Sequence, residues 1–145
     1  MTRKKRIKVV WICHLSNSEV REHLSIHVPF AEKIVRAVMR NPSKEHSDFA
    51  IWNTNGIHEF ENFTDEVELH IIAPYRYLIP QEVRFEQRGI HYYFFKDSPS
   101  LLFLEARKRF LGKYEFGYEK NRAFIKKEIN AIRPDIVHII GAENP

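Results

Sequence analysis

The chain has 145 residues, a net charge of +4 at pH 7, and 43% apolar and 13% aromatic residues. This length fits one domain, and the apolar content excludes a chain that is disordered throughout. The positive charge favours acidic partners such as phosphates, nucleic acid or an anionic membrane surface, while a single cysteine excludes an internal disulfide.

The first residues form a basic lead-in to an apolar strand. The segment 1–6 superficially resembles the start of a signal peptide, but the apolar part that follows is short and 14–19 contains no small-residue cleavage site. Nor does any apolar run approach the roughly 20 residues that span a bilayer. Lys8 to Cys13 is too apolar for a half-exposed strand, so we predict a buried strand that contains Cys13.

Two helices are expected before the next strand. Pro29 suits the first position of a helix, and Asn41 marks its end. Its apolar residues recur along one stripe: Phe30, Ile34, Val35, Val38 and Met39. Asn53 or Thr54 suits the N-cap of a second helix that ends at Thr64-Asp65. Its inward-facing residues are expected to be Ile57, Phe60 and Phe63. The type of the run 49–52 stays open.

The second half of the chain alternates strands with helices. Val67–Ala73, closed by Pro74, and Ile90–Phe95, after a turn at Gly89, are typical of strands. Residues 75–87 give no clear signal. Helices are expected over 101–111 and 114–132. In the second of these, one stripe is apolar (Tyr118, Phe124 or Ile125, Ile129, Ile132), and five charged residues are expected to be exposed (Lys120, Arg122, Lys126, Lys127, Glu128).

The final stretch determines the fold prediction. Pro134 disfavours helix in the residue before it, so a helix ends there and Ile136–Ile140 follows as a strand buried on both faces. Strands that alternate with helices predict an α/β, Rossmann-like domain with a mainly parallel sheet. We predict that the first and last strands are parallel neighbours. The polar segments that follow them would then face one crevice, since ligands bind beyond the carboxyl ends of strands where the strand order reverses.

The stretch Pro134-Asp135-Ile136-Val137-His138, continued by Ile-Ile-Gly-Ala-Glu-Asn-Pro to 145, resembles the end of an N-terminal-domain strand in GT-B glycosyltransferases, most closely the family 4 group of retaining enzymes. The resemblance implies that 1–145 is one incomplete Rossmann-like N-terminal domain on the acceptor side. A C-terminal domain that holds the sugar nucleotide would be absent. We therefore expect the first part of a longer protein, inactive by itself.

The resemblance implies a transferase that moves sugar from a nucleotide-sugar donor, used as a substrate, to a hydroxyl of a sugar or lipid-linked acceptor, with no cofactor and no metal. It also implies a cytoplasmic protein, with peripheral contact to the inner face of the membrane as an extension. The chain departs from the family pattern at Ile140, where members often have a second histidine, and at 14–18, where many have Gly-Gly.

The candidate site residues each have a structural alternative. His138 and Glu143 are the candidate catalytic residues; His138 is otherwise a packed core histidine, and Glu143 a solvated loop residue. The candidate acceptor-binding residues are Ser16, Asn17, Ser18, Glu19, Gly141 and Asn144. The first four would otherwise cap the next helix. Arg21 would bind a phosphate or be an ordinary surface arginine.

Several other classes of site lack support. Six further histidines show no ligand pattern: His23, His27, His46, His58, His70 and His91. No Gly-x-Ser-x-Gly, Gly-x-Gly-x-x-Gly or Walker motif occurs. Glutamates interrupt the basic stretch 107–122, which argues against a nucleic-acid face. The alternatives to a transferase are a non-catalytic Rossmann-like interaction module and half of a GT-B-fold sugar-nucleotide epimerase.

Overall fold

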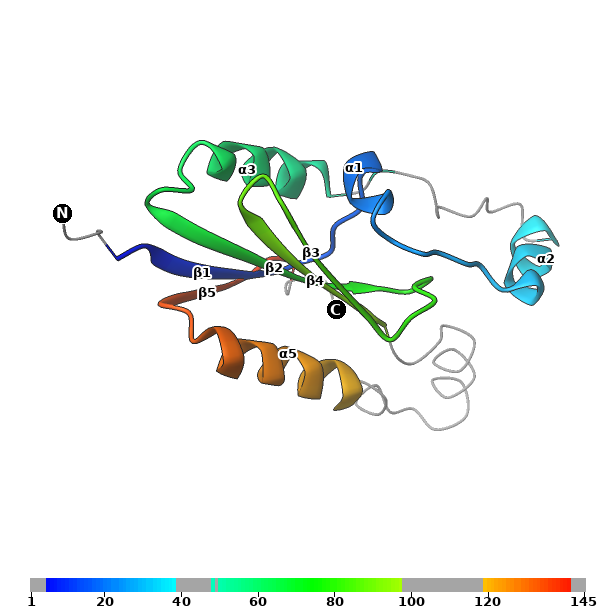
Figure 1. Cartoon of the computed structure of the whole chain (residues 1–145). Coiled ribbons are helices and arrows are strands. Elements are labelled where there is room, and N and C mark those ends of the chain that lie inside the picture. The colour runs from blue at the N-terminus through cyan, green and yellow to red at the C-terminus, as the bar shows by residue number, and fades with distance from the viewer. Residues whose placement is uncertain (1–4, 39–47, 49, 98–118, 142–145) are drawn as a thin grey trace.

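The computed structural model describes residues 5–38, 48, 50–97 and 119–141. Figure 1 shows its elements in chain order: β1 (Ile7–Ile12), α1 (Ser18–Arg21), α2 (Phe30–Val38), α3 (Ile51–Glu61), β2 (Val67–Tyr75), β3 (Glu82–Gln87), β4 (Ile90–Lys96), α5 (Glu119–Ile132) and β5 (Ile136–Ile139). The helix predicted over 101–111 and the residues 114–118 of the last predicted helix lie outside the described residues.

The strands form one five-stranded sheet in the order β3-β4-β2-β1-β5. β1 pairs in parallel with β2 on one side and with β5 on the other, where Val9 lies opposite Ile136 and Ile12 opposite Ile139. β4 is parallel to β2, and β3 is antiparallel to β4. The prediction that the first and last strands are parallel neighbours is therefore confirmed, as is a mainly parallel α/β sheet.

Helices cover both faces of the sheet (Figure 1). Alternate side chains of each strand point to opposite faces, so β1, β2 and β4 contribute to a core on each face. On the face towards α1 and α3, the core includes Leu69, Ile71 and Phe94 with Ile57 of α3. On the other face, Val10, Ile72 and Phe95 pack with Ile132 and the apolar stripe of α5. This is the layering of a doubly wound domain.

The segment without a clear sequence signal forms half of a hairpin. β3 alternates exposed and half-buried residues, and Arg88 and Gly89 join it to β4 with φ angles of 52° and 78°. Both φ angles are positive, as a tight two-residue hairpin turn requires. Arg88 occupies a conformation that glycine or asparagine adopts more easily. Its guanidinium forms ion pairs with Glu19 and Glu61, at 3.2 and 3.3 Å, which tie the turn to α1 and α3.

Two helix boundaries differ from the prediction. α3 begins at Ile51, earlier than an Asn53 or Thr54 cap would allow, and its N-cap Ala50 has a φ of 55° and no side-chain cap bond. Asn53 is instead buried within the helix, where its amide donates to the His14 carbonyl at 2.9 Å. α3 ends at Glu61, before Thr64-Asp65, so Phe63 lies beyond it and is exposed. α5 ends at Ile132, and Arg133, before Pro134, has a positive φ, as predicted for a helix end.

Three predictions about the strands and α5 were wrong. β2 continues through Pro74 to Tyr75, because Pro74 needs only a φ that extended backbone also allows. β5 is exposed throughout, with Ile136 at 53% and Ile139 at 58%, since it is the outer strand and the described residues provide no cover for it. Glu128 is buried, because Arg84 of β3 reaches it across the sheet with a 2.9 Å ion pair.

Within the described ranges, no helix is both long enough and apolar enough to cross a bilayer.

Candidate functional site

The carboxyl ends of β1 and β5 lie beside each other. The ladder continues one step past β5, where the Ile140 amide donates to the Ile12 carbonyl at 2.9 Å. On the other side, the Cys13 amide donates to the Ile72 carbonyl of β2. The chain therefore leaves β1 at Cys13 next to the point where it leaves β5 at Gly141, whose φ of 82° turns the backbone away. β2, β4 and β3 lie on one side of β1, and β5 lies on the other side, so the strand order reverses here.

The loop after β1 is held by side chains that were candidates for binding. Ser16 is buried, its hydroxyl accepts from Arg21 at 3.0 Å, and it lies 3.4 Å from the Tyr75 hydroxyl. Arg21 also pairs with Asp48 at 2.7 Å. These contacts fix the loop against the end of β2 and give Arg21 a structural role instead of a free surface position.

The Asn17 side chain caps α1. Its Oδ1 accepts from the Val20 amide at 2.8 Å, and its Nδ2 donates to Thr54 Oγ1 of α3 at 3.2 Å. A cap of this kind is worth about 0.5–2 kcal/mol. The capping alternative is therefore the one that the structure contains, and Asn17 orients the loop between α1 and α3.

Glu19 does not point to the edge between β1 and β5. Its carboxylate pairs with Arg88 of the β3–β4 turn and lies 3.8 Å from His58 of α3. Four described residues at the carboxyl ends of β1 and β5 are exposed: His14, Ser18, His138 and Gly141. Glu143 and Asn144 lie outside the described residues.

His138 is not the packed core histidine of the structural alternative. It is exposed on β5 and makes an edge-to-face contact with the Trp11 ring, with ring centroids 6.0 Å apart. Trp11 also contacts Phe60 of α3 edge to face at 5.2 Å. The His138 ring is thus supported by the tryptophan and still exposed, which suits a residue that contacts a ligand.

Cys13 lies at the same strand end but has no nucleophilic character. It is buried, as predicted, and burial raises the pKa of its thiol to about 12. The thiolate is the nucleophilic form of cysteine, so a thiol with this pKa is inert near neutral pH. The site therefore offers imidazole, hydroxyl and backbone groups for hydrogen bonding.

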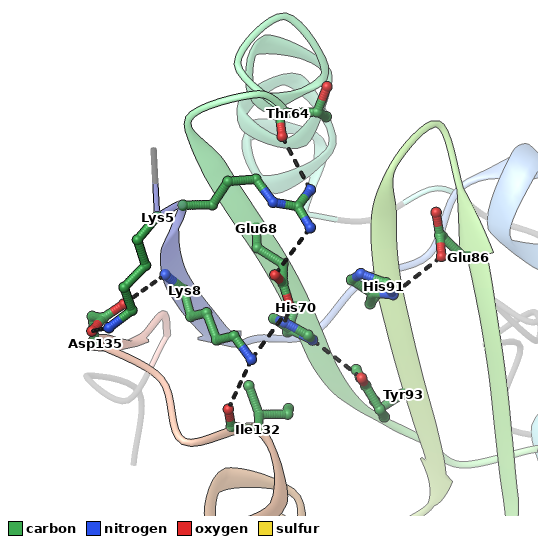
Figure 2. Close-up of polar contacts among 11 residues, drawn as sticks. Lys5, Lys8, Thr64, Glu68, His70, Glu86, His91, Tyr93, Ile132 and Asp135 are labelled. Carbon is green, nitrogen blue, oxygen red and sulfur yellow. Dashed lines mark hydrogen bonds and ion pairs between the residues drawn. The ribbon is translucent and has the colours of Figure 1, made fainter. Parts of the chain in front are cut away.

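A second polar cluster lies on the α5 face of the sheet. Figure 2 shows Glu68 and His70 of β2 beside His91 of β4, with Lys8 and Tyr93 around them. His70 Nε2 lies 3.0 Å from Glu68 Oε1, and His70 Nδ1 lies 3.1 Å from the Tyr93 hydroxyl. The His70 and His91 rings stack with centroids 4.7 Å apart. One ligand-type atom from each of Glu68, His70 and His91 falls within 4.8 Å of the others.

Burial and two basic neighbours, Arg6 and Lys8, determine the charges of this cluster. Burial lowers the pKa of His70 and outweighs the hydrogen bond to Glu68 that acts to raise it, so His70 is neutral near pH 7. Burial alone would raise the pKa of Glu68, but the His70 hydrogen bond and the charges of Lys8 and Arg6 hold it below its usual value. Arg6 and Lys8 lie 3.1 and 3.7 Å from the Glu68 carboxylate.

The sequence interpretation found no ligand pattern among the histidines and missed this cluster. Glu68 and His70 are two apart on a strand, so a shared face could have been noted from the sequence alone. Their position opposite His91 depends on the register between β2 and β4, which pairs His70 with His91. No sequence pattern specified that register.

Comparison of this chain with protein-family models, curated proteins and solved structures finds no match. The resemblance to GT-B glycosyltransferases therefore stays a prediction that rests on the residues of the last strand.

Proposed function

We propose that this chain is the acceptor-binding N-terminal domain of a glycosyltransferase that transfers a sugar from a nucleotide-sugar donor to a hydroxyl acceptor. The observation that carries the proposal is the reversal of strand order between β1 and β5. Open α/β sheets bind ligands beyond the carboxyl ends of strands at such a reversal. In this proposal the described residues His14, Ser18 and His138 lie where a ligand of this fold class would bind.

The exposed groups at this edge suit a hydroxyl-rich ligand. His14, Ser18 and His138 offer imidazole nitrogens and a hydroxyl, which both donate and accept. Ser16 and Asn17 support these groups, because their hydrogen bonds hold the loop in its conformation. In this proposal His138 orients an acceptor hydroxyl, and Glu143 stabilises positive charge that develops at the transferred sugar carbon.

The donor would be bound by a C-terminal domain across a cleft, as the resemblance implies. Basic side chains of that domain would offset the charge of the leaving diphosphate, so transfer would need no metal. A lipid-linked acceptor would bring this domain to the inner face of a membrane, where its net charge of +4 favours anionic lipid.

A non-catalytic interaction module is the second candidate. Three of the residues expected to bind an acceptor, Ser16, Asn17 and Glu19, instead form hydrogen bonds or ion pairs within the protein. These contacts favour an interaction module. Ligand preference separates the two candidates. A transferase domain of this kind binds saccharides, whereas an interaction module has no reason to do so.

Saturation-transfer difference NMR on the 145-residue chain tests the proposal. We expect signals from hexoses and hexose phosphates, weaker signals from uridine and guanosine diphosphate sugars, and no sugar transfer by the chain alone. His14→Ala and His138→Ala should each weaken saccharide binding, whereas Glu59→Ala, an exposed residue near the end of α3, should not. Full turnover by this chain, or saccharide binding that both histidine variants leave unchanged, contradicts the proposal.

A further inference from the structure

We propose that Glu68, His70 and His91 bind a divalent transition metal ion, with Zn²⁺ as the best fit. Two imidazoles and one carboxylate are a ligand set that zinc uses in sites that keep a fourth position open. The three side chains come from adjacent strands β2 and β4, at positions that the parallel register places side by side (Figure 2). The site is separate from the β1–β5 edge and does not depend on the proposed function.

The sheet provides a rigid frame for these ligands. The His70 side chain is only 6% exposed, and those of Glu68 and His91 are 17% and 30% exposed. Ligand atoms in a tetrahedral zinc site lie about 3.3 Å apart, which follows from bond lengths of about 2.0–2.2 Å. The present separations are at most 4.8 Å, so side-chain rotations can close the site while the strands stay in place. The partly exposed His91 leaves a route for the ion to enter.

Tyr93 supplies the outer contact that a metal-binding histidine requires. Glu68 can only accept, so His70 Nε2–H donates to it, and Nδ1 then accepts from the Tyr93 hydroxyl. When Nε2 binds a metal, the proton moves to Nδ1, which donates to the Tyr93 oxygen instead. His70 stays neutral throughout, and this outer hydrogen bond fixes the ring orientation.

Two cationic side chains lie near the Glu68 carboxylate, each beside a different oxygen. Arg6 lies 3.1 Å from Glu68 Oε2, while Lys8 lies 3.7 Å from Oε1, the oxygen that also contacts His70. The metal would take the position at Oε1 and displace the Lys8 ammonium. Lys8 Nζ also donates to the Ile132 carbonyl at 3.4 Å, so it has a second partner when displaced. Removing the Lys8 charge should therefore strengthen metal binding.

Cobalt substitution tests the site directly. The tag-free 145-residue chain is titrated with Co²⁺ and then with Zn²⁺ in competition with a chromogenic chelator at pH 7.5. We expect one equivalent of Co²⁺ to give the intense visible absorption of a tetrahedral N/O site, which Zn²⁺ then abolishes. His91→Gln should remove this band, and His23→Gln, whose ring stacks on Phe85 elsewhere, should retain it.

Two further variants separate a built site from adventitious binding. Tyr93→Phe should weaken Zn²⁺ binding about 10–100-fold, as expected for loss of an outer hydrogen bond to a ligand. Lys8→Gln should strengthen it. Circular dichroism confirms that each variant is folded, and the partly exposed His91 makes its variant the least disruptive of the ligand changes. Absence of the band in the unmodified chain, or a band that persists in His91→Gln, overturns the proposal.

Discussion

Asp135 holds the start of β5 against β1. Its Oδ2 accepts from the Lys8 amide at 2.9 Å, and its carboxylate lies 3.7 Å from the Lys5 ammonium. The Asp135 amide in turn donates to the Lys8 carbonyl at 2.8 Å, so residue 135 closes a reciprocal pair of bonds. The side chain thereby sets the register in which β5 delivers its carboxyl end to the site.

The charge of Asp135 should make this register sensitive to acid. The hydrogen bond from the Lys8 amide lowers the pKa of Asp135, burial acts to raise it, and the Lys5 charge adds to the lowering. A lowered pKa in the folded state gives stability that is present above the ordinary value of about 4, and that is lost as pH falls through the lower folded value. Asp135→Asn should therefore destabilise the chain at pH 7, and the difference should vanish at the lowest pH.

Urea unfolding of both chains between pH 7 and pH 2 measures this difference. Asp65→Asn, an exposed position in the turn before β2, serves as the matched charge control and should show little effect. An Asp135→Asn difference that stays constant across this range would show that the carboxylate charge contributes nothing.

At the scale of elements, α3 packs on the sheet through a glycine. A Cβ built on Gly56 would lie 3.0 Å from Trp11 Cη2 and 3.3 Å from Cζ3. The Trp11 ring has little room to move, because Phe60 and His138 contact it edge to face. The absence of a side chain at residue 56 therefore sets how closely α3 approaches β1, next to the candidate site.

Gly56→Val should destabilise the fold by about 1–3 kcal/mol, the usual cost of overpacking a well-packed contact. Asn55→Val changes an exposed neighbour in the same helix without the clash. Helix propensity favours Gly56→Val and is nearly neutral for Asn55→Val, so propensity cannot account for a loss of stability at residue 56. The comparison of the two by urea unfolding isolates the packing term. Equal stability of the two variants would mean that Trp11 can move aside, and that Gly56 does not set the spacing.

At the scale of the whole molecule, the apolar pattern predicted β1, β2, β4 and β5 and a mainly parallel sheet, but it gave no signal for β3. The apolar residues Val9, Val10 and 71–73 are buried because they lie within the sheet, between helices. The same reasoning failed for β5. An apolar run indicates a strand that gains from cover on both faces, but it does not show whether the described part of the chain supplies that cover.

The candidate site was predicted only in part, for a similar reason. The placement of the two strand ends followed from fold class, and the structure places them together. The roles of individual polar residues could not be predicted from the fold class, because a residue such as Asn17 is equally suited to cap a helix or to bind a ligand. The Glu68, His70 and His91 cluster depends on cross-strand register, which the chain specifies only through the packing of the complete sheet.

The central claim is that the edge where β1 and β5 end binds a hydroxyl-rich ligand. The most direct measurement is a map of amide chemical-shift changes in the isotope-labelled chain as hexoses and hexose phosphates are added. The largest changes should fall on 14–18 and 138–141. Changes confined to the opposite ends of these strands, near Ile7 and Ile136, or no changes at any residue, would contradict this claim.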